Sequence, residues 1–327
     1  MIERRRLVHA VALILAPAIV AAFGLSVAAA ILLTLLLLLW RWMIVLSSLA
    51  LSPKVPELVL ETISASHFVE KVRWSLDRLG VDYVEQPWGG TLGAFFRGRS
   101  VPLLKMRTGR VQSNIGNSAE ILRYLWGRYA FERPEAAAFL QPTVERVQLE
   151  ERLDRYGVNL QVWVYYHLLD HRELTLQAWG ANNPATPHWQ RLSLRLLFPL
   201  LRVLIRKSFR ISDDHYARAV LRIEELLGEM DELLKDNRQS LLGDDTSNYT
   251  DIAFAAMTAL WLMPAGFAAG KADAVRIDPH KAPAGMLKDI EVWSSGYARV
   301  AAFVTRLYAE ERLPQTDTAA TRSMSAR

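Results

Sequence analysis

The sequence predicts an N-terminal transmembrane segment, then an α+β domain, then an all-α domain. Residues 7–39 carry no formally charged side chain, which is typical of a membrane segment. Short β-rich runs then alternate with helical spacing, and the later part of the chain shows helical spacing with few strand signals. These patterns divide the chain into a membrane segment or hairpin over 1–52, an α+β domain over 57–130, an all-α domain over 135–312 and a disordered tail over 313–327.

Composition limits the chemistry. The 327 residues carry a net charge of +5 and no Cys, which excludes disulfides, thiolate metal sites and a Cys nucleophile. Any reaction must therefore use hydroxyls, imidazoles or a bound thiol. The positive charge would suit nucleic acid, but the Arg residues are scattered and no aromatic-basic platform is present. Attraction to a membrane surface explains the charge better, and we expect no nucleic-acid partner.

The apolar N-terminal run is too long for one ordinary span. A helix of roughly 33 residues would measure about 50 Å against a hydrocarbon core of about 30 Å. We expect a hairpin of two short spans that turns near Gly24 and Ser26 and leaves the membrane at residues 40–42, although a tilted single span stays open. A cleaved signal peptide is disfavoured because the apolar run continues past any plausible cleavage site. A hairpin keeps Arg4 to Arg6 and the soluble domain on the cytoplasmic face.

The first soluble elements are predicted from alternation and helical spacing. Residues 57–63 read as a strand, residues 66–80 as a helix that closes on Gly80, and residues 81–88 as a second strand. Residues 100–112 then form a hairpin about Thr108 and Gly109, and a helix follows over 117–129. The order is βαβ, a loop and ββα.

Three motifs in this order resemble the glutathione transferase family. They are "SHFVEKVRWSLDRLGVDY", "SVPLLK" and "NSAEILRYL", and "SLLGDDTSNYTDIAFAAMTALW" resembles a later segment of the family's α-domain. The resemblance implies a thioredoxin-like domain followed by an α-helical domain, that is, the glutathione transferase fold. It also implies glutathione as a co-substrate and a hydrophobic small molecule as the second substrate, with no metal.

The resemblance gives several residues a role. Ser66 stands at a helix start, where a hydroxyl and the helix N-terminus would stabilise the thiolate of glutathione, so it is the candidate catalytic residue. Val101 would pair with the cysteinyl unit if its bond to Pro102 is cis, and Asn117 and Ser118 would bind the γ-glutamyl carboxylate. From the sequence alone, Ser66 and Ser118 are equally well explained as helix caps.

Three departures from the family pattern leave alternatives open. His67 stands where the family has proline, Asn117 replaces an acidic residue, and the turn before Ser118 is about three residues longer than usual. Gln112 and Ser113 therefore compete with Asn117 and Ser118 for the γ-glutamyl role.

The predicted all-α domain contains fewer residues that point to a functional site. Tyr156 and Trp163 lie on the helix that lines the second substrate's pocket in the family, so both are candidate substrate-binding residues. His167 and His171 share a helical face, but no third metal ligand is evident. Asn248 with Asp251 forms a capping-box pattern whose role is folding.

A basic amphipathic stretch covers residues 191–210. It either packs in the α-domain or lies on the membrane surface.

The sequence therefore predicts a membrane-anchored glutathione transferase-like protein. Its thiolate would attack a hydrophobic electrophile. The alternative is a non-catalytic binding module of the same fold at the membrane. Dimerisation is not fixed by the sequence, and a homodimer stays open.

Overall fold

The structure is a computed structural model that describes residues 15–16, 19, 26–50, 55–90, 92, 101–108 and 111–312. By internal contacts the chain forms two compact units. One comprises residues 1–58 and 105–113, and the other residues 59–104 and 114–327. Both predicted soluble domains fall largely in the second unit, so the boundary near residue 130 stays a prediction. The expected tail lies outside the described residues.

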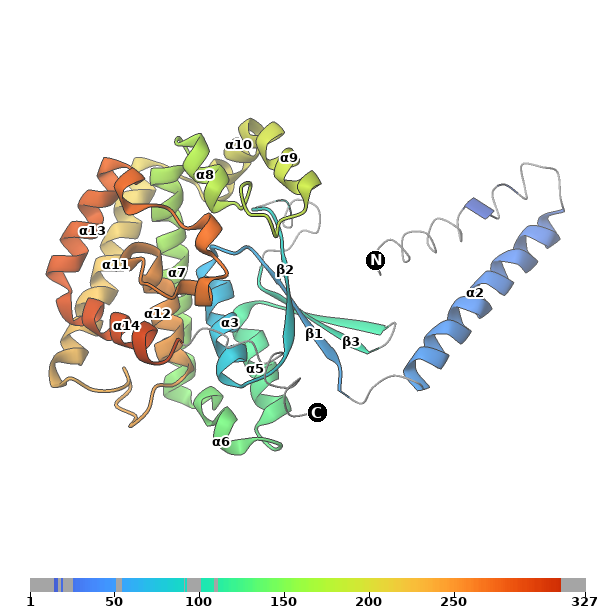
Figure 1. Ribbon diagram of the computed structural model, residues 1–327, viewed down its shortest axis with the longest axis horizontal. Coiled ribbons are helices and arrows are strands. Elements are labelled where there is room, and N and C mark those ends of the chain that lie inside the picture. Colours follow the sequence, from blue (N-terminus) through green and yellow to red (C-terminus); the bar gives the residue numbers. More distant parts are fainter. Residues whose placement is uncertain are drawn as a thin grey trace, which may run out of the picture. The chain divides into compact units, whose positions relative to one another are not determined.

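Helix α2, Val27–Ala50, is the apolar helix near the N-terminus (Figure 1). Its 24 residues give a length of about 36 Å, and the stretch Val27–Ser47 is apolar enough to cross a membrane. The aromatic pair Trp40 and Trp42 lies inside this helix, so the expected exit from the membrane at this pair is not where the helix ends. The predicted turn residue Gly24 and nearly all of the first leg lie outside the described residues.

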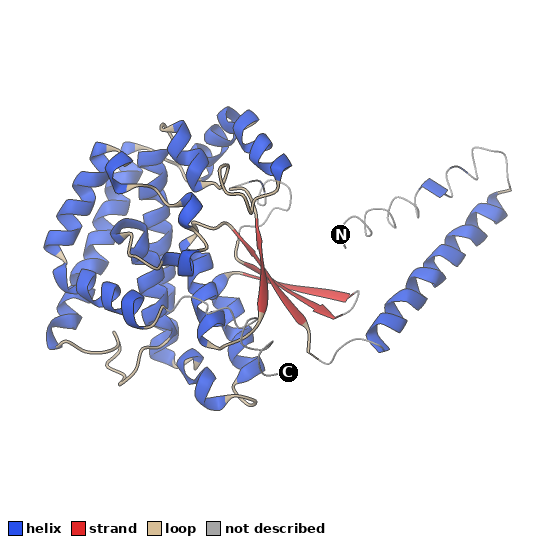
Figure 2. Cartoon of the chain, in the orientation of Figure 1, coloured by secondary structure: helices blue, strands red, loops and turns tan. Residues whose placement is uncertain are grey.

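The predicted βαβ and ββα order is confirmed. Helix α3, His67–Arg78, joins β1, Glu57–Thr62, to β2, Tyr83–Pro87. Strands β3, Leu103–Thr108, and β4, Val111–Gly116, lead into α5, Ser118–Tyr129, and the sheet order is β2-β1-β3-β4 (Figure 2). Residues 58–62 of β1 are all buried, as expected for an apolar strand in the middle of a sheet.

Every longer element after residue 130 is a helix, as predicted for the described part of the chain. The α-helices are α6 Pro134–Ala137, α7 Val144–Leu168, α8 Arg172–Ala178, α9 His188–Leu196, α10 Phe198–Ser208, α11 Asp213–Leu233, α12 Tyr249–Leu262, α13 Ala284–Gly296 and α14 Ala298–Glu310. Helix α12 is buried along almost its whole length and packs against α3, α7 and α14.

Two local features position these helices. The predicted capping box is confirmed, because the Asn248 side chain and the Asp251 carboxylate satisfy backbone N–H groups at the start of α12. In α7, Gly157 allows close approach of α3 and α12. A Cβ at this position would lie 2.6 Å from Met257 Sδ and 3.0 Å from Phe68 Cζ. The absence of a side chain therefore brings α7 against the start of α3.

Candidate functional site

Ser66 lies at the junction between β1 and α3 with an extended backbone, at φ −75° and ψ 125°. Its Oγ accepts a hydrogen bond from the Val69 N–H at 3.4 Å, so Ser66 does cap the helix. A serine hydroxyl can accept and also donate one hydrogen bond, so this cap leaves the hydroxyl proton available. Capping and donation to a bound sulfur are therefore compatible.

The peptide bond between Val101 and Pro102 is cis, which confirms the sequence prediction. Pro102 is buried and directly precedes β3, whereas Val101 is partly exposed. The partly exposed Val101 thus lies just before the N-terminal end of β3, an inner strand of the sheet.

Ser118 is the first residue of α5, and its side chain is an unusual feature of the site. The residue is 2% exposed, and its Oγ has no hydrogen-bond partner in the described part of the chain. Asn117, at φ 69°, caps the helix instead and accepts the Ala119 N–H at 3.1 Å. A buried hydroxyl without a partner costs free energy, and a helix N-terminus is a position that favours negatively charged groups.

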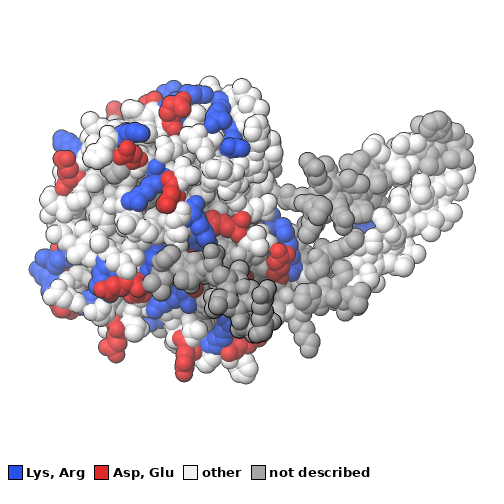
Figure 3. Space-filling model, viewed as in Figure 1, with Lys and Arg blue, Asp and Glu red and all other residues white. Residues whose placement is uncertain are grey.

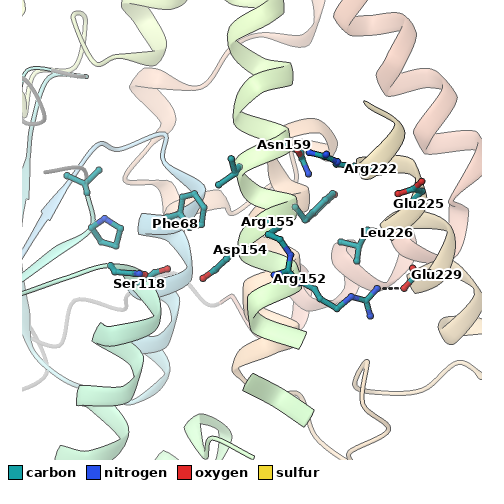
Figure 4. A pocket seen from close by; sticks show the side chains of 15 residues that line it. Phe68, Ser118, Arg152, Asp154, Arg155, Asn159, Arg222, Glu225, Leu226 and Glu229 are labelled. Carbon is teal, nitrogen blue, oxygen red and sulfur yellow. Dashed lines mark hydrogen bonds and ion pairs between the residues drawn. The ribbon is translucent and has the colours of Figure 1, made fainter. Parts of the chain in front are cut away.

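A cavity of about 880 Å³, which we call the polar cavity, opens beside Ser118 (Figure 4). Phe68, Val101, Pro102 and Asn117 contribute to the same wall. The opposite wall comes from α7 and α11 and is rich in charged and amide side chains, namely Arg152, Asp154, Arg155, Asn159, Arg222, Glu225 and Glu229. Figure 4 shows Asp154 projecting from α7 toward the side on which Ser118 lies. This composition suits a zwitterionic or peptide-like ligand.

A second cavity, of about 460 Å³, contains Ser66. We call it the apolar cavity, because its wall is mostly hydrophobic and aromatic, with Ile63, Val164, Tyr165, Leu168, Trp179, Phe209 and Leu260 among the lining residues. Phe68, Val101 and Val158 line both cavities, so the two spaces adjoin. Ser66 therefore faces an apolar space that borders a polar one.

His67 does not add positive charge to this site. Burial lowers its pKa from 6.5 to about 3, and hydrogen bonding to the Gly157 backbone only partly opposes that shift. The imidazole is therefore neutral at physiological pH. Stabilisation of a bound thiolate would have to come from the Ser66 hydroxyl and the N-terminus of α3.

The structure separates the two aromatic candidates of α7. Tyr156 lines the polar cavity, but its hydroxyl lies 3.3 Å from Thr258 Oγ1 and accepts the Trp261 indole N–H at 3.1 Å. Trp163 is fully buried, and its indole N–H donates to Asp289 at 2.8 Å. Trp163 lines neither cavity, so the geometry gives it a packing role.

The competing γ-glutamyl candidates also differ in position. Gln112 and Ser113 lie within β4, and neither lines the polar cavity, whereas Asn117 and Ser118 both do. Sequence reasoning missed Val158, Gln161 and Tyr165, which line the apolar cavity from one face of α7. Their spacing of three and four residues was the available signal.

His167 is held by a carboxylate. Its Nε2 lies 3.1 Å from Asp289 Oδ2, which also accepts a hydrogen bond from the Tyr216 hydroxyl at 2.7 Å. Burial would raise the pKa of Asp289, but the bonds from His167, Tyr216 and Trp163 lower it below its ordinary value. Over the described ranges, no group of three or more His, Cys, Asp or Glu side chains is placed to hold a metal ion.

Comparison with known proteins identifies similar solved structures only. No protein-family model matches the chain, and no curated protein matches it. Rice GST1 (OsGSTU1), in complex with glutathione, is 16% identical over 84% of this chain and 97% of its own, with a TM-score of 0.43.

Two further solved structures resemble this chain to a similar degree. A glutathione transferase family member from Pseudomonas fluorescens pf-5, with two glutathione bound, is 14% identical over 78% of this chain and 90% of its own, with a TM-score of 0.44. Glutathione transferase Omega 2C from Trametes versicolor is 14% identical over 83% and 98%, with a TM-score of 0.44. At these values the likenesses do not decide the function, which depends on the chain's own residues.

Proposed function

We propose that this chain is a membrane-anchored, glutathione transferase-like protein that binds glutathione in the polar cavity. The observation that carries the proposal is the buried hydroxyl of Ser118 at the start of α5, which has no hydrogen-bond partner among the described residues and lines the same cavity as the cis-bonded Val101 and Pro102. In the proposed pose, Ser118 and the first N–H groups of α5 bind the γ-glutamyl carboxylate. Asp154 lies across the cavity and suits the ammonium of the same group.

The rest of the pose follows from the adjoining cavities. The cysteinyl unit pairs with the backbone of Val101, which lines both spaces. Its sulfur then points toward the apolar cavity, where the Ser66 hydroxyl donates a hydrogen bond to the thiolate. A hydrophobic electrophile occupies the apolar cavity. The thiol loses its proton to solvent, a sulfur–carbon bond forms, and a leaving anion departs or, in an addition, the substrate takes up a proton.

Glutathione titration calorimetry tests the binding site. Replacing Ser118 with Ala should raise the glutathione Kd roughly 10- to 100-fold, because a hydrogen bond to a charged group is lost. Ser113→Ala is the matched control, since Ser113 is exposed in β4 and lines no part of the polar cavity, and its Kd should not change. If Ser113→Ala raised the Kd and Ser118→Ala did not, the γ-glutamyl site would lie at Gln112 and Ser113. A wild-type protein that binds no glutathione would refute the proposal.

One observation favours the alternative of a non-catalytic binding module. The Ser66 hydroxyl already serves as the cap of α3, so the residue has a structural reason to be there. Under this alternative the wild-type protein binds glutathione but turns over no electrophile. Under the transferase proposal, a generic aromatic electrophile is consumed in the presence of glutathione.

We assign α2 as the membrane anchor, with the soluble domain on the cytoplasmic face. The support is its apolar length, together with the cluster Arg4 to Arg6, which should stay in the cytoplasm. Because α2 is long enough for one crossing, a second crossing before it is required to keep both ends inside. A fusion of a fluorescent reporter to the C-terminus should be active, and an alkaline phosphatase fusion should be inactive. Phosphatase activity without fluorescence would place the domain outside.

A further inference from the structure

Helices α9 and α10 have two apolar faces, one buried and one exposed. On the inward face, Leu194, Phe198, Leu201 and Ile205 belong to a buried cluster with residues of α7 and α8. On the outward face, large apolar side chains recur at helical spacing, namely Trp189, Leu192, Leu196, Leu200 and Val203. Leu196 is 69% exposed and Trp189 51%. Burial in this domain therefore accounts for only one of the two faces.

The same segment is strongly cationic. Residues 187–210 contain no Asp or Glu, and their Lys and Arg residues are Arg191, Arg195, Arg202, Arg206, Lys207 and Arg210. Asp170 pairs with both Arg202 and Arg206. Lys207 and Arg210 are exposed, and no carboxylate of the described chain lies within ion-pair distance of either. In Figure 3, blue side chains lie among white ones at the upper edge, with red side chains beside them, where Figure 1 places α8, α9 and α10.

Charge and composition together decide what covers the outward face. A second copy docked on this face would bring two cationic segments together, and like-charge contacts are unfavourable. An apolar helix face with Leu and Trp, next to Lys and Arg and without acidic residues, instead fits the boundary between headgroups and acyl chains. Anionic lipid headgroups supply the complementary charge.

We propose that α9 and α10 form a docking surface for an anionic lipid bilayer. Trp189, Leu196 and Leu200 enter the headgroup boundary, and the flanking cations bind lipid phosphates. This surface is a second membrane contact, which does not depend on glutathione binding. The surface also lies next to the proposed second-substrate site. Trp179 belongs to the buried cluster beneath α9 and α10, and Phe209 packs against that cluster. Both side chains also line the apolar cavity. If the proposed function holds, docking brings that cavity close to membrane-dissolved substrates.

The cysteine-free chain allows a direct test. A single cysteine at Leu200→Cys in α10 or at Val292→Cys in α13 is labelled with an environment-sensitive fluorophore in the full-length protein. The two positions are matched, since Leu200 is 49% exposed and Val292 50%. The protein is reconstituted in phosphatidylcholine vesicles with and without phosphatidylglycerol, and with a lipid-attached quencher. We expect quenching at Leu200→Cys to be at least about twofold stronger in the anionic vesicles, with little quenching at Val292→Cys.

Charge-reversed variants test whether the cations of α10 and its C-terminal end are needed for the quenching. Lys207→Glu with Arg210→Glu should abolish the extra quenching at Leu200→Cys, whereas Arg218→Glu with Lys288→Glu, exposed cations elsewhere, should preserve it. Equal quenching at both labels, or quenching that ignores anionic lipid, would overturn the proposal. Concentration-dependent shielding of the Leu200→Cys label in detergent, without vesicles, would indicate a second copy and also overturn it. The readout uses no glutathione, so its failure is distinct from failure of the proposed function.

Discussion

Replacing Ser66 with Ala should lower turnover of a generic electrophile roughly 100-fold while the glutathione Kd changes less than about threefold. The Ser66 Oγ accepts the Val69 N–H and so retains its own proton to donate to the bound sulfur. Without that donor the pKa of the bound thiol should rise, because neutral His67 cannot compensate. The pH dependence of thiolate ultraviolet absorbance in the complex measures this rise.

Two further substitutions separate catalysis from capping. Ser66→Asp keeps a good helix cap but has no proton to donate at neutral pH, so it should fold and yet lose turnover. Ser66→Thr keeps both the cap and the donor and should restore much of the activity. If Ser66→Ala and Ser66→Asp both turned over at the wild-type rate, Ser66 would be a cap only, and the thiolate would be stabilised elsewhere.

Local patterns in the sequence were sufficient to predict several elements of both soluble domains. Alternation predicted β1, helical spacing with Gly80 predicted α3 and its end, and the capping box of Asn248 and Asp251 predicted the start of α12. Each of these signals lies within a few residues of the element that it sets. The cis bond before Pro102 was likewise predicted from its strand context and the motif resemblance.

The lining of the cavities depends on contacts between distant segments and was harder to predict. Sequence reasoning selected Tyr156 and Trp163 by residue type, but the face of α7 that meets the apolar cavity carries Val158 and Tyr165. Which face of α7 points to the site depends on how this helix packs against α11 and α12, and the sequence of one helix does not show that packing. Trp179, contributed to the same wall by the end of α8, had no local signal.

The end of helix α2 was also not predictable from local composition. Tryptophan and arginine at residues 40–42 resemble an interfacial belt, yet α2 continues through them to Ala50. Residues 43–50 contain neither Gly nor Pro, so no strong helix breaker follows Trp42 directly. A helix stop requires a cap or a breaker, and the first strong breaker is Pro53.

The largest loss of stability is expected at a buried ion network around α3. Arg73 is completely buried and pairs with Glu70 at 2.8 Å and with Glu85 of β2 at 2.7 Å. Arg312, near the end of the described chain, pairs with the same Glu70 at 2.7 Å and with Asp77 at 2.8 Å. Glu70 thus joins α3 to the C-terminal end of the helical region.

Glu70→Ala should reduce the free energy of unfolding by about 3–5 kcal/mol, because it leaves two buried guanidinium groups without their shared partner. Urea unfolding of the detergent-solubilised protein, followed by Trp fluorescence, measures the change. Glu132→Ala is the control, since Glu132 forms an exposed pair with Arg128 and its loss should leave the midpoint unchanged. An unchanged midpoint for Glu70→Ala would show that Glu70 contributes no net stability.

The same network gives stability a defined pH dependence through Glu85. Burial would raise the pKa of Glu85, but the charge and hydrogen bonds of Arg73 outweigh it and hold the pKa below its ordinary value of 4.5. A carboxyl with a lowered pKa in the folded state stabilises the protein above its ordinary pKa, and that contribution is lost as the pH falls through the folded value. The stability difference between wild type and Glu85→Gln should therefore be largest at neutral pH and shrink on acidification. A difference that grew toward acid pH would show that burial, and not Arg73, controls this carboxylate.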